Sequence, residues 1–384
     1  MNAFEDRVKG VLISAALGDA LGAPVEKLSR EEIEKEYGYV TTLKTRWYKE
    51  ALGEEATLGK RRGNGIITDD TLMTIALCRV YKKERRHLDA YDLANEFTKE
   101  IAFRKTFIPE FGRDSLILDR LFYPEKHIFL RHALANCEPR EGGIGNMVNC
   151  GAAMYIAPIG IVNAGNPLAA YNEAIAFASG HQVSYGLEAA GVLAACVACA
   201  FIPNVTVQEV VDAAISLAKD GTKQAIIALT KEAKELRKRK CSYRELVKCL
   251  HESISPFSPM GDDVHRKIEK VGIPSNHYTP SRLFSIEELP LALAFIVYND
   301  GEYYKSILDG INSGRDTDSI GVMAGVILGA MYGTKYINED DIHLLSKTNQ
   351  LDFNEEAASF AEVAKEIILR DLQIIRKQEG IIGH

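Results

Sequence analysis

The segment NSGRDTDSIGVMAGVILGAMYG (312–333) decides the fold of this chain. Its glycines recur at every fourth position, at Gly321, Gly325, Gly329 and Gly333. On a helix this spacing aligns them in one stripe, along which another backbone can approach closely. A glycine destabilises a helix by about 0.5–1 kcal/mol relative to alanine, so several in one helix need a compensating reason. We therefore expect this helix to pack tightly against others at the centre of the fold.

Small residues follow the same spacing in two other segments. These rows are Ser14, Gly18 and Gly22, and Gly186, Ala190, Ala194 and Ala198. Elsewhere apolar residues recur at i, i+3, i+4 and i+7, as in 91–103, 206–239 and 353–378, while no stretch shows sustained strand alternation. The sequence therefore predicts an all-α protein that forms a single compact multi-helix domain.

The chain shows no internal boundary. No linker rich in Pro, Ser or Gly divides it, so we expect one domain over 1–384 that ends in C-terminal helices at 339–384. The segments 37–65 and 103–145 combine aromatic and turn residues with weak periodicity, and we interpret them as excursions from this domain. The amphipathic C-terminal helix could pack on its own chain or pair with another subunit. We favour packing within the chain and predict no oligomer.

Charge argues against a nucleic-acid partner. The chain has 46 Lys or Arg and 53 Asp or Glu, a net charge of −7, whereas a protein that binds by neutralising phosphates carries a basic field. The basic run at 231–240 ends a long amphipathic helix, where basic residues suit the helix dipole. We interpret that run as a solvated face.

Cysteine usage and hydropathy predict a cytoplasmic protein that does not enter a membrane. The seven cysteines are odd in number and scattered, which is typical of reduced thiols. The N-terminus MNAFEDRVKG has acidic residues where a signal peptide has basic ones. The apolar stretches 189–203 and 320–333 are shorter than the ~20 residues that span a bilayer.

Three acidic clusters precede or begin predicted helices. They are ALGDALGAPVE with Asp19 and Glu26, ITDDT with Thr68, Asp69, Asp70 and Thr71, and NSGRDTDS with Asp316, Asp318 and Ser319. Adjacent residues on a helix diverge by about 100° and residues two apart by about 200°, so such pairs converge only from a non-helical turn. One isolated pair would be read as a helix N-cap, but several clusters together present a set of oxygen donors.

These clusters point to metal binding. Grouped carboxylates repel one another and take up protons unless a divalent cation is present. Hard oxygen ligands without sulfur or nitrogen select Mg²⁺ or Mn²⁺, and no loop of the sequence resembles an EF-hand Ca²⁺ site. Two clusters of this kind suggest two metal ions.

A series of motifs resembles the ADP-ribosylglycohydrolase family. The motifs are GVLISAALGDALGAPVE (10–26), ITDDTLMTIAL (67–77), NCGAAMYIAPIG (149–160), SGHQVSYGLEAAG (179–191) and the opening segment (312–333), in the family's order. They span 10–333, most of the chain. The resemblance implies one all-α domain with a binuclear Mg²⁺ or Mn²⁺ centre in a cleft.

Carried over position by position, the resemblance also implies site residues. The implied metal ligands are Thr68, Asp69, Asp70, Asp316, Asp318 and Ser319. Glu26 would stand beside the metals as a catalytic carboxylate that shuttles a proton, with Asp69 and Asp318 as further catalytic residues. Asp19 would support the site by hydrogen bonding rather than as a ligand.

The loops that would face a substrate depart from the family pattern. Many members read GNGSAMR where this chain reads NCGAAMY (149–155), Thr-His where it reads Gly180-His181, and GGDTD where Arg315 gives SGRDTD. The implied substrate contacts are Asn149, Cys150, Gly151, Tyr155, His181, Gly314 and Arg315. The sequence leaves open whether His181 and Tyr155 touch substrate or only pack, and whether Arg315 binds substrate or balances the acidic cluster.

We therefore predict a metal-dependent glycosidase that cleaves a ribosyl glycosidic bond. The favoured reaction removes ADP-ribose from a modified protein or a small acceptor. Two alternatives stay open: a hydrolase of free nucleosides or other small ribosides, which the altered loops suggest, and a non-catalytic ADP-ribose-binding protein, against which the retained carboxylates argue.

Overall fold

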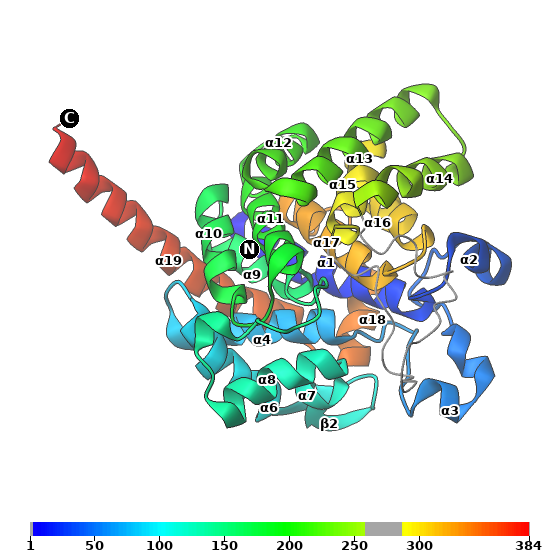
Figure 1. Ribbon diagram of the computed structural model, residues 1–384, viewed down its shortest axis with the longest axis horizontal. Coiled ribbons are helices and arrows are strands. Elements are labelled where there is room, and N and C mark those ends of the chain that lie inside the picture. Colours follow the sequence, from blue (N-terminus) through cyan, green and yellow to red (C-terminus); the bar gives the residue numbers. More distant parts are fainter. Residues whose placement is uncertain (1–2, 258–285, 384) are drawn as a thin grey trace.

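The computed structural model describes residues 3–257 and 286–383 of the chain (Figure 1). Its helices are α1 (Ala3–Gly22), α2 (Arg30–Tyr37), α3 (Glu54–Thr57), α4 (Asp69–Glu84), α5 (Ala90–Asp92), α6 (Thr98–Ala102), α7 (Ile117–Arg120), α8 (Tyr123–Ala135), α9 (Ala157–Val162), α10 (Pro167–Ala178), α11 (Ser184–Ala200), α12 (Val207–Leu217), α13 (Asp220–Arg239), α14 (Tyr243–Ile254), α15 (Glu288–Tyr298), α16 (Tyr303–Asn312), α17 (Thr317–Tyr332), α18 (Glu339–Asn349) and α19 (Phe353–Ile382). The all-α prediction is confirmed. Over the described ranges the only sheet is one hairpin, β1 (Lys105–Ile108) paired antiparallel with β2 (Arg113–Leu116).

The two glycine-rich helices α1 and α17 pack against each other at the centre of the fold (Figure 1). A Cβ atom added to Gly325 would lie 2.5 Å from the carbonyl oxygen of Ser14, and one added to Gly329 would lie 2.5 Å from that of Gly10. No side chain fits between backbones this close. The tight packing predicted from the glycine stripe is confirmed, and the small-residue row of α1 is its partner.

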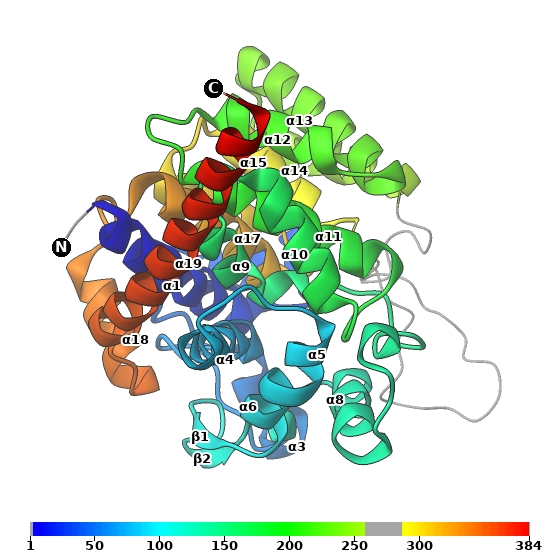
Figure 2. The ribbon, with the colours of Figure 1, turned by 90° about the vertical axis from the view of Figure 1, so that its left-hand side faces the viewer.

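Other helices surround this central pair. Helix α1 also contacts α4 and α19, while α17 contacts α11, α15 and α16 (Figure 2). Their apolar side chains join in one continuous hydrophobic core, which extends from Val8 in α1 to Ile367 in α19. The helices therefore hold the ends of α1, α4 and α17 in fixed relative positions.

Helix α1 has a second property that the sequence analysis did not single out. With its continuation to Val25, it is the one helix in the described part of the chain long and apolar enough to cross a membrane, and 94% of its apolar window is buried inside the fold. Its apolar residues serve here as core residues of the helical assembly.

The C-terminal helix α19 begins where Asp352 accepts hydrogen bonds from the backbone N–H groups of Asn354 and Glu355. Its first half packs on the body of the protein, with Phe360 and Ile367 buried. Its second half projects away from the other helices and exposes Leu372 and Ile375 (Figure 1).

Candidate metal centre

The ends of three central helices position the acidic clusters. Thr68 is the N-cap of α4, and Asp316 is the N-cap of α17. Close packing of Gly22 against the backbone of Asp318 brings the end of α1 to the start of α17, and the Thr317 hydroxyl donates a 2.8 Å hydrogen bond to the carbonyl oxygen of Gly22. The clusters meet where these helices begin or end. Asp69 and Asp70 are the first two residues of α4, and Asp318 is the second residue of α17, so the carboxylates converge from first helical turns and not, as expected, from non-helical turns.

Carboxylates from separate clusters converge at this point. Glu26, Asp316 and Asp318 each place one oxygen within 4.8 Å of the others. Asp70 joins the clusters, since Ser319 Oγ donates to its Oδ1 at 3.3 Å and Thr68 Oγ1 donates to its Oδ2 at 3.4 Å. The structure therefore brings together the predicted oxygen donors of both motifs and Glu26.

The electrostatics of the cluster favour a bound cation. Burial, reinforced by Asp19, Asp69 and Asp316, holds the pKa of Asp70 well above its usual value. Burial and the neighbouring carboxylates likewise raise the pKa of Asp318. Within the described ranges no Lys or Arg forms an ion pair with Asp70, Asp316 or Asp318. Buried oxygen donors that repel one another in this way fit a divalent cation, which would supply the missing positive charge.

Two arginines, the buried Arg120 and the partly buried Arg62, balance the outer carboxylates of the cluster. Arg62 Nη1 lies 2.5 Å from Glu26 Oε2, and Arg120 Nη1 lies 2.5 Å from Asp69 Oδ1. Both arginines also pair with Glu110, which is fully buried at the turn of the β1–β2 hairpin. Burial opposes charge on Glu110, but Arg120 and Arg62 outweigh it and keep its pKa below the usual value.

None of the three residues of this arginine network is among the site residues predicted from the sequence. Arg62 lies in the segment 37–65 and both Glu110 and Arg120 lie in the segment 103–145, the two regions without clear periodicity. The only feature of the sequence that points to these residues is that both segments lie between the acidic motifs.

Asp19 supports the centre by hydrogen bonding, as predicted. Its buried carboxylate accepts hydrogen bonds from the backbone N–H of Thr68 at 2.9 Å, from the N–H of Thr71 at 3.2 Å and from the Thr71 hydroxyl at 2.5 Å. Burial raises the pKa of Asp19 to about 6, although these hydrogen bonds oppose the shift. Asp19 thereby fixes the turn from which Thr68, Asp69 and Asp70 enter the site.

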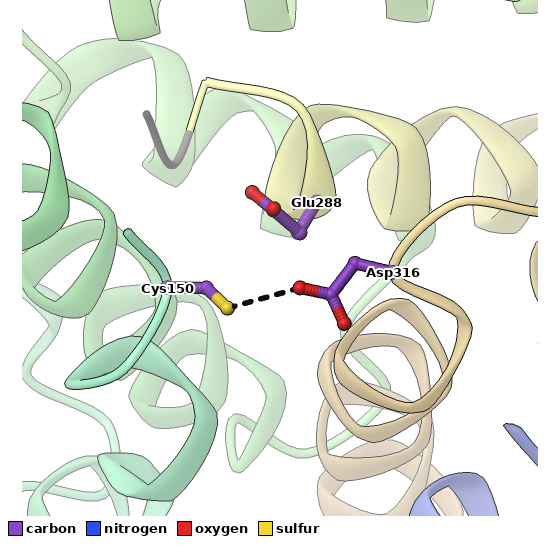
Figure 3. Close-up of side chains that lie close together, drawn as sticks. All are labelled: Cys150, Glu288 and Asp316. Atoms are coloured by element: carbon purple, nitrogen blue, oxygen red, sulfur yellow. Dashed lines mark hydrogen bonds between the residues drawn. The ribbon is translucent and has the colours of Figure 1, made fainter. Parts of the chain in front are cut away.

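Cys150 reaches the same centre from the opposite side. Its Sγ lies 3.3 Å from Asp316 Oδ2 and 3.4 Å from Ser319 Oγ. Figure 3 shows the Cys150 and Asp316 side chains pointing toward each other, with Glu288, at the start of α15, beside them. The predicted substrate contact at Cys150 is therefore adjacent to a predicted metal ligand.

The other residues of that loop belong to a buried hydrogen-bond network. Asn149 Nδ2 donates to Glu125 Oε1 at 2.8 Å, and Asn149 Oδ1 accepts from the N–H of Gly151 at 2.8 Å. His181 is fully buried, with Nε2 bonded to Glu125 and Nδ1 2.8 Å from the Tyr155 hydroxyl. The structure places Tyr155 and His181 behind the loop that carries Cys150, so contact with a substrate stays a prediction for both.

Arg315 and Gly314 form the turn before α17. Both have positive φ values, 76° for Arg315 and 85° for Gly314. This conformation is unfavourable for residues other than glycine. The Arg315 guanidinium makes two hydrogen bonds to Glu287, from Nε at 3.0 Å and from Nη2 at 2.7 Å. Glu287 is not one of the clustered carboxylates, so this geometry does not decide between the two roles that the sequence leaves open for Arg315.

Taken together, these features define an all-helical protein with a group of oxygen donors at the ends of its central helices, and comparison with known proteins narrows this class. The family model described as ADP-ribosylglycohydrolase matches residues 1–371. The chain belongs to the ADP-ribosylglycohydrolase family, and the resemblance proposed from its motifs is confirmed.

Individual relatives agree with this assignment. The chain is 25% identical over 359 residues to the uncharacterized protein YegU of Escherichia coli, covering 93% of this chain and 97% of that protein. It is 29% identical over 164 residues to the ADP-ribosyl-[dinitrogen reductase] glycohydrolase of Rhodospirillum rubrum, covering 42% of this chain and 46% of that enzyme.

A solved structure supports the fold. The chain of an ADP-ribosylglycohydrolase-related protein complex superposes with a TM-score of 0.57 at 17% identity, covering 95% of this chain and 100% of that one. Membership of a glycohydrolase family supports hydrolysis of a glycosidic bond on ADP-ribosyl substrates.

Proposed function

We propose that this protein is a divalent-metal-dependent hydrolase that cleaves the glycosidic bond of an ADP-ribosyl group attached to a protein or a small acceptor. The observation that carries the proposal is the convergence of the buried carboxylates Asp70, Asp316 and Asp318 with the half-buried Glu26 at the ends of α1, α4 and α17. A cluster of this kind is costly for folding, so a cation that offsets the repulsion is its simplest purpose.

The residues that would hold two Mg²⁺ or Mn²⁺ ions are Thr68, Asp69, Asp70, Asp316, Asp318 and Ser319. When bound, such ions supply positive charge that acidifies water and binds the ribose diol. Mg²⁺ and Mn²⁺ suit this set because its donors are carboxylate and hydroxyl oxygens.

The chain's own residues account for the proton transfers. Hydrolysis forms a bond between a water oxygen and the anomeric carbon, and it breaks the bond from that carbon to the leaving group. In this proposal Glu26 accepts the proton that the water loses and delivers it to the leaving group. The ion pair between Arg62 and Glu26 supports this role by orienting the carboxylate, and Asp318, which groups with Glu26, would stabilise positive charge that develops on the sugar ring.

A second candidate keeps this chemistry and changes the substrate to a free nucleoside or another small riboside. The observations in its favour are two contacts made by residues that differ from the family pattern. Cys150 lies at the metal centre where many family members carry asparagine, and Arg315 pairs with Glu287 rather than pointing away as a ligand for phosphate.

The experiment is a panel of hydrolysis assays with Mg²⁺ or Mn²⁺. The substrates are an ADP-ribosyl-arginine peptide, an ADP-ribosyl-serine peptide, O-acetyl-ADP-ribose, ADP-ribose and a set of nucleosides, each tested beside an Asp316→Ala/Asp318→Ala double variant. Release of ADP-ribose by the wild type alone supports the proposal. Turnover of nucleosides alone supports the second candidate, and ligand binding without turnover of any substrate supports a binding protein.

A further inference from the structure

A thiol and two carboxylates from three separate parts of the chain meet on one side of the metal centre. Cys150 lies in the loop before α9, Glu288 is the first residue of α15, and Asp316 is the N-cap of α17 (Figure 3). The Cys150 sulfur and one oxygen from each carboxylate all lie within 4.8 Å of one another. The exposed fractions are 6% for Cys150, 1% for Glu288 and 7% for Asp316, so these atoms converge in the interior.

Asp316 belongs to two donor sets. On one side it groups with Glu26 and Asp318, a set of oxygens only, and on the other side it groups with Cys150 and Glu288, a set that includes sulfur. Hard oxygen donors suit Mg²⁺ and Mn²⁺, whereas a sulfur donor shifts preference toward Zn²⁺ and its analogue Co²⁺. The two sides of Asp316 therefore differ in the metal that they select.

Neighbouring contacts keep the sulfur in this position. Asn149 and Gly151, on either side of Cys150, are fixed because Asn149 binds Glu125 and accepts the N–H of Gly151. Asn149 Oδ1 also accepts a 2.6 Å hydrogen bond from the Gln182 side chain. A ligand held by its supporting contacts in this way is preorganised for a metal ion.

We propose that Cys150, Glu288 and Asp316 form a binding site for a thiophilic divalent cation of the Zn²⁺ type, with Asp316 shared between this site and the oxygen-donor centre. The inference extends the proposed function, since it assigns a different metal preference to one side of the same centre. Binding replaces the Cys150 thiol proton by the cation, and that proton passes to solvent.

The test uses Co²⁺ as the probe, because a thiolate bound to Co²⁺ gives a charge-transfer absorption band in the near ultraviolet. Purified full-length protein is titrated with Co²⁺, and Zn²⁺ is then added in competition. The variants are Cys150→Ser, Glu288→Gln and, as a matched control, Cys241→Ser, whose thiol is half-buried beside Tyr298. Circular dichroism confirms that each variant is folded.

The wild type and Cys241→Ser are expected to show the band and to lose it on addition of Zn²⁺. Cys150→Ser is expected to lack the band and to bind Zn²⁺ at least about tenfold more weakly, while Glu288→Gln keeps a weaker band. Absence of the band in wild type, or its persistence in Cys150→Ser, would overturn the inference.

A separate measurement distinguishes this inference from the proposed function. Mn²⁺ binding is followed by electron paramagnetic resonance in the wild type and in Asp318→Asn, which lies outside the sulfur-containing set. Wild type that shows the Co²⁺ band but neither binds Mn²⁺ nor hydrolyses the panel would refute the proposed function and support the thiophilic site. Wild type that binds Mn²⁺ and hydrolyses substrate without a Co²⁺ band would support the proposed function and refute the thiophilic site.

Discussion

Asp19 is the residue on which the geometry of the TDDT motif depends most directly. Its carboxylate accepts hydrogen bonds from two backbone N–H groups and one hydroxyl, all in the turn from Thr68 to Thr71. All three donors contact Oδ2, and the Thr68 N–H also lies 3.0 Å from Oδ1. An asparagine whose oxygen took the Oδ2 position would direct its NH₂ group at the Thr68 N–H. The Asp19 carboxylate is therefore a positioning group that an amide replaces only in part.

Asp19→Asn is expected to lower the free energy of unfolding by about 1–3 kcal/mol, because a buried NH₂ group would face the Thr68 N–H in place of an accepting oxygen. It should also weaken Mn²⁺ binding by about 10–100-fold, as expected for a residue that orients ligands. Urea unfolding and Mn²⁺ titration measure the two effects. Asp352→Asn, at the exposed N-cap of α19, is the matched control, because asparagine caps a helix as well as aspartate does. Equal stability and equal Mn²⁺ affinity of Asp19→Asn and Asp352→Asn would contradict this role of Asp19.

At the residue scale the sequence predicted the acidic clusters but not their counter-charges. Aspartates in TDDT and DTDS stand beside helix starts, and that local pattern predicts convergence. Arg62 pairs with Glu26 at a separation of 36 residues, and Arg120, at the end of the short helix α7, pairs with Asp69. Ion pairs over such distances carry no periodic signal. Residue type likewise did not reveal that His181 and Tyr155 are fully buried.

Two elements hold the site together, the α1–α17 pair and the β1–β2 hairpin. In the helix pair, backbone approaches backbone, so a side chain at Gly325 has no space. The sequence predicted that these helices are crowded, because four-residue spacing defines a stripe. It did not predict that α1 and α17 are partners, because spacing identifies a face and not the surface that covers it.

Gly325→Leu is expected to destabilise the protein by about 3 kcal/mol or more, because a Cβ there would lie 2.5 Å from the Ser14 carbonyl oxygen and the helices would have to separate. Gly380→Ala, in the projecting part of α19 where an added Cβ meets nothing within 4 Å, should leave stability equal or raise it by about 0.5–1 kcal/mol. Thermal unfolding of both variants measures the difference. A fully stable Gly325→Leu protein would contradict the packing described.

Glu110 links the hairpin to the metal centre through Arg62 and Arg120. Glu110→Gln is expected to lower the free energy of unfolding at pH 7 by about 3 kcal/mol, because two buried guanidinium groups lose a shared carboxylate. The pKa of Glu110 lies below its usual value of 4.5, so the charged carboxylate stabilises the protein above pH 4.5 and this contribution is lost as the pH falls further. Urea unfolding at pH 7, at pH 4 and below pH 4 should show that the free energy of unfolding of the wild type falls toward that of Glu110→Gln as the pH decreases. A difference in the free energy of unfolding between wild type and Glu110→Gln that stays constant over this pH range would contradict the expectation.

Across the whole molecule, His87 joins three helices that are distant in sequence. Its Nδ1 lies 2.6 Å from Glu173 in α10, and its Nε2 lies 3.0 Å from Asp371 in α19, while His87 itself follows α4. The hydrogen bond to Glu173, with a further contribution from Asp371, raises the pKa of His87 to about 9, although burial opposes the shift. His87 is therefore protonated at neutral pH and fastens α19 to the body.

This pKa shift predicts a pH dependence of stability. Because the folded pKa exceeds the unfolded value of 6.5, the stabilisation is complete below pH 6.5 and is lost as the pH rises toward 9. The stability gap between wild type and His87→Gln should therefore narrow from pH 6 to pH 9.5 in urea unfolding. His127→Gln, on the exposed face of α8, serves as the control. Parallel profiles for wild type and His87→Gln would contradict the assignment.

At this scale the sequence predicted the fold class and the family, because helical periodicity and ordered motifs run along most of the chain. It did not predict that half of α19 projects from the body, since an amphipathic pattern continues through both halves. It also did not single out α1 as an apolar helix long enough to cross a membrane, because charged residues at its start and Asp19 near its end interrupt the apolar pattern.

The most direct test of the central claim measures release of ADP-ribose from an ADP-ribosylated peptide by the wild type and by Asp318→Asn, each after EDTA treatment and after addition of Mn²⁺. Asp318 is the appropriate position, because its carboxylate lies within 4.8 Å of Glu26 and Asp316. The account predicts product only from wild type with Mn²⁺ and a rate at least about 100-fold lower in the variant. Equal rates in wild type and variant, or full activity in EDTA, would contradict it.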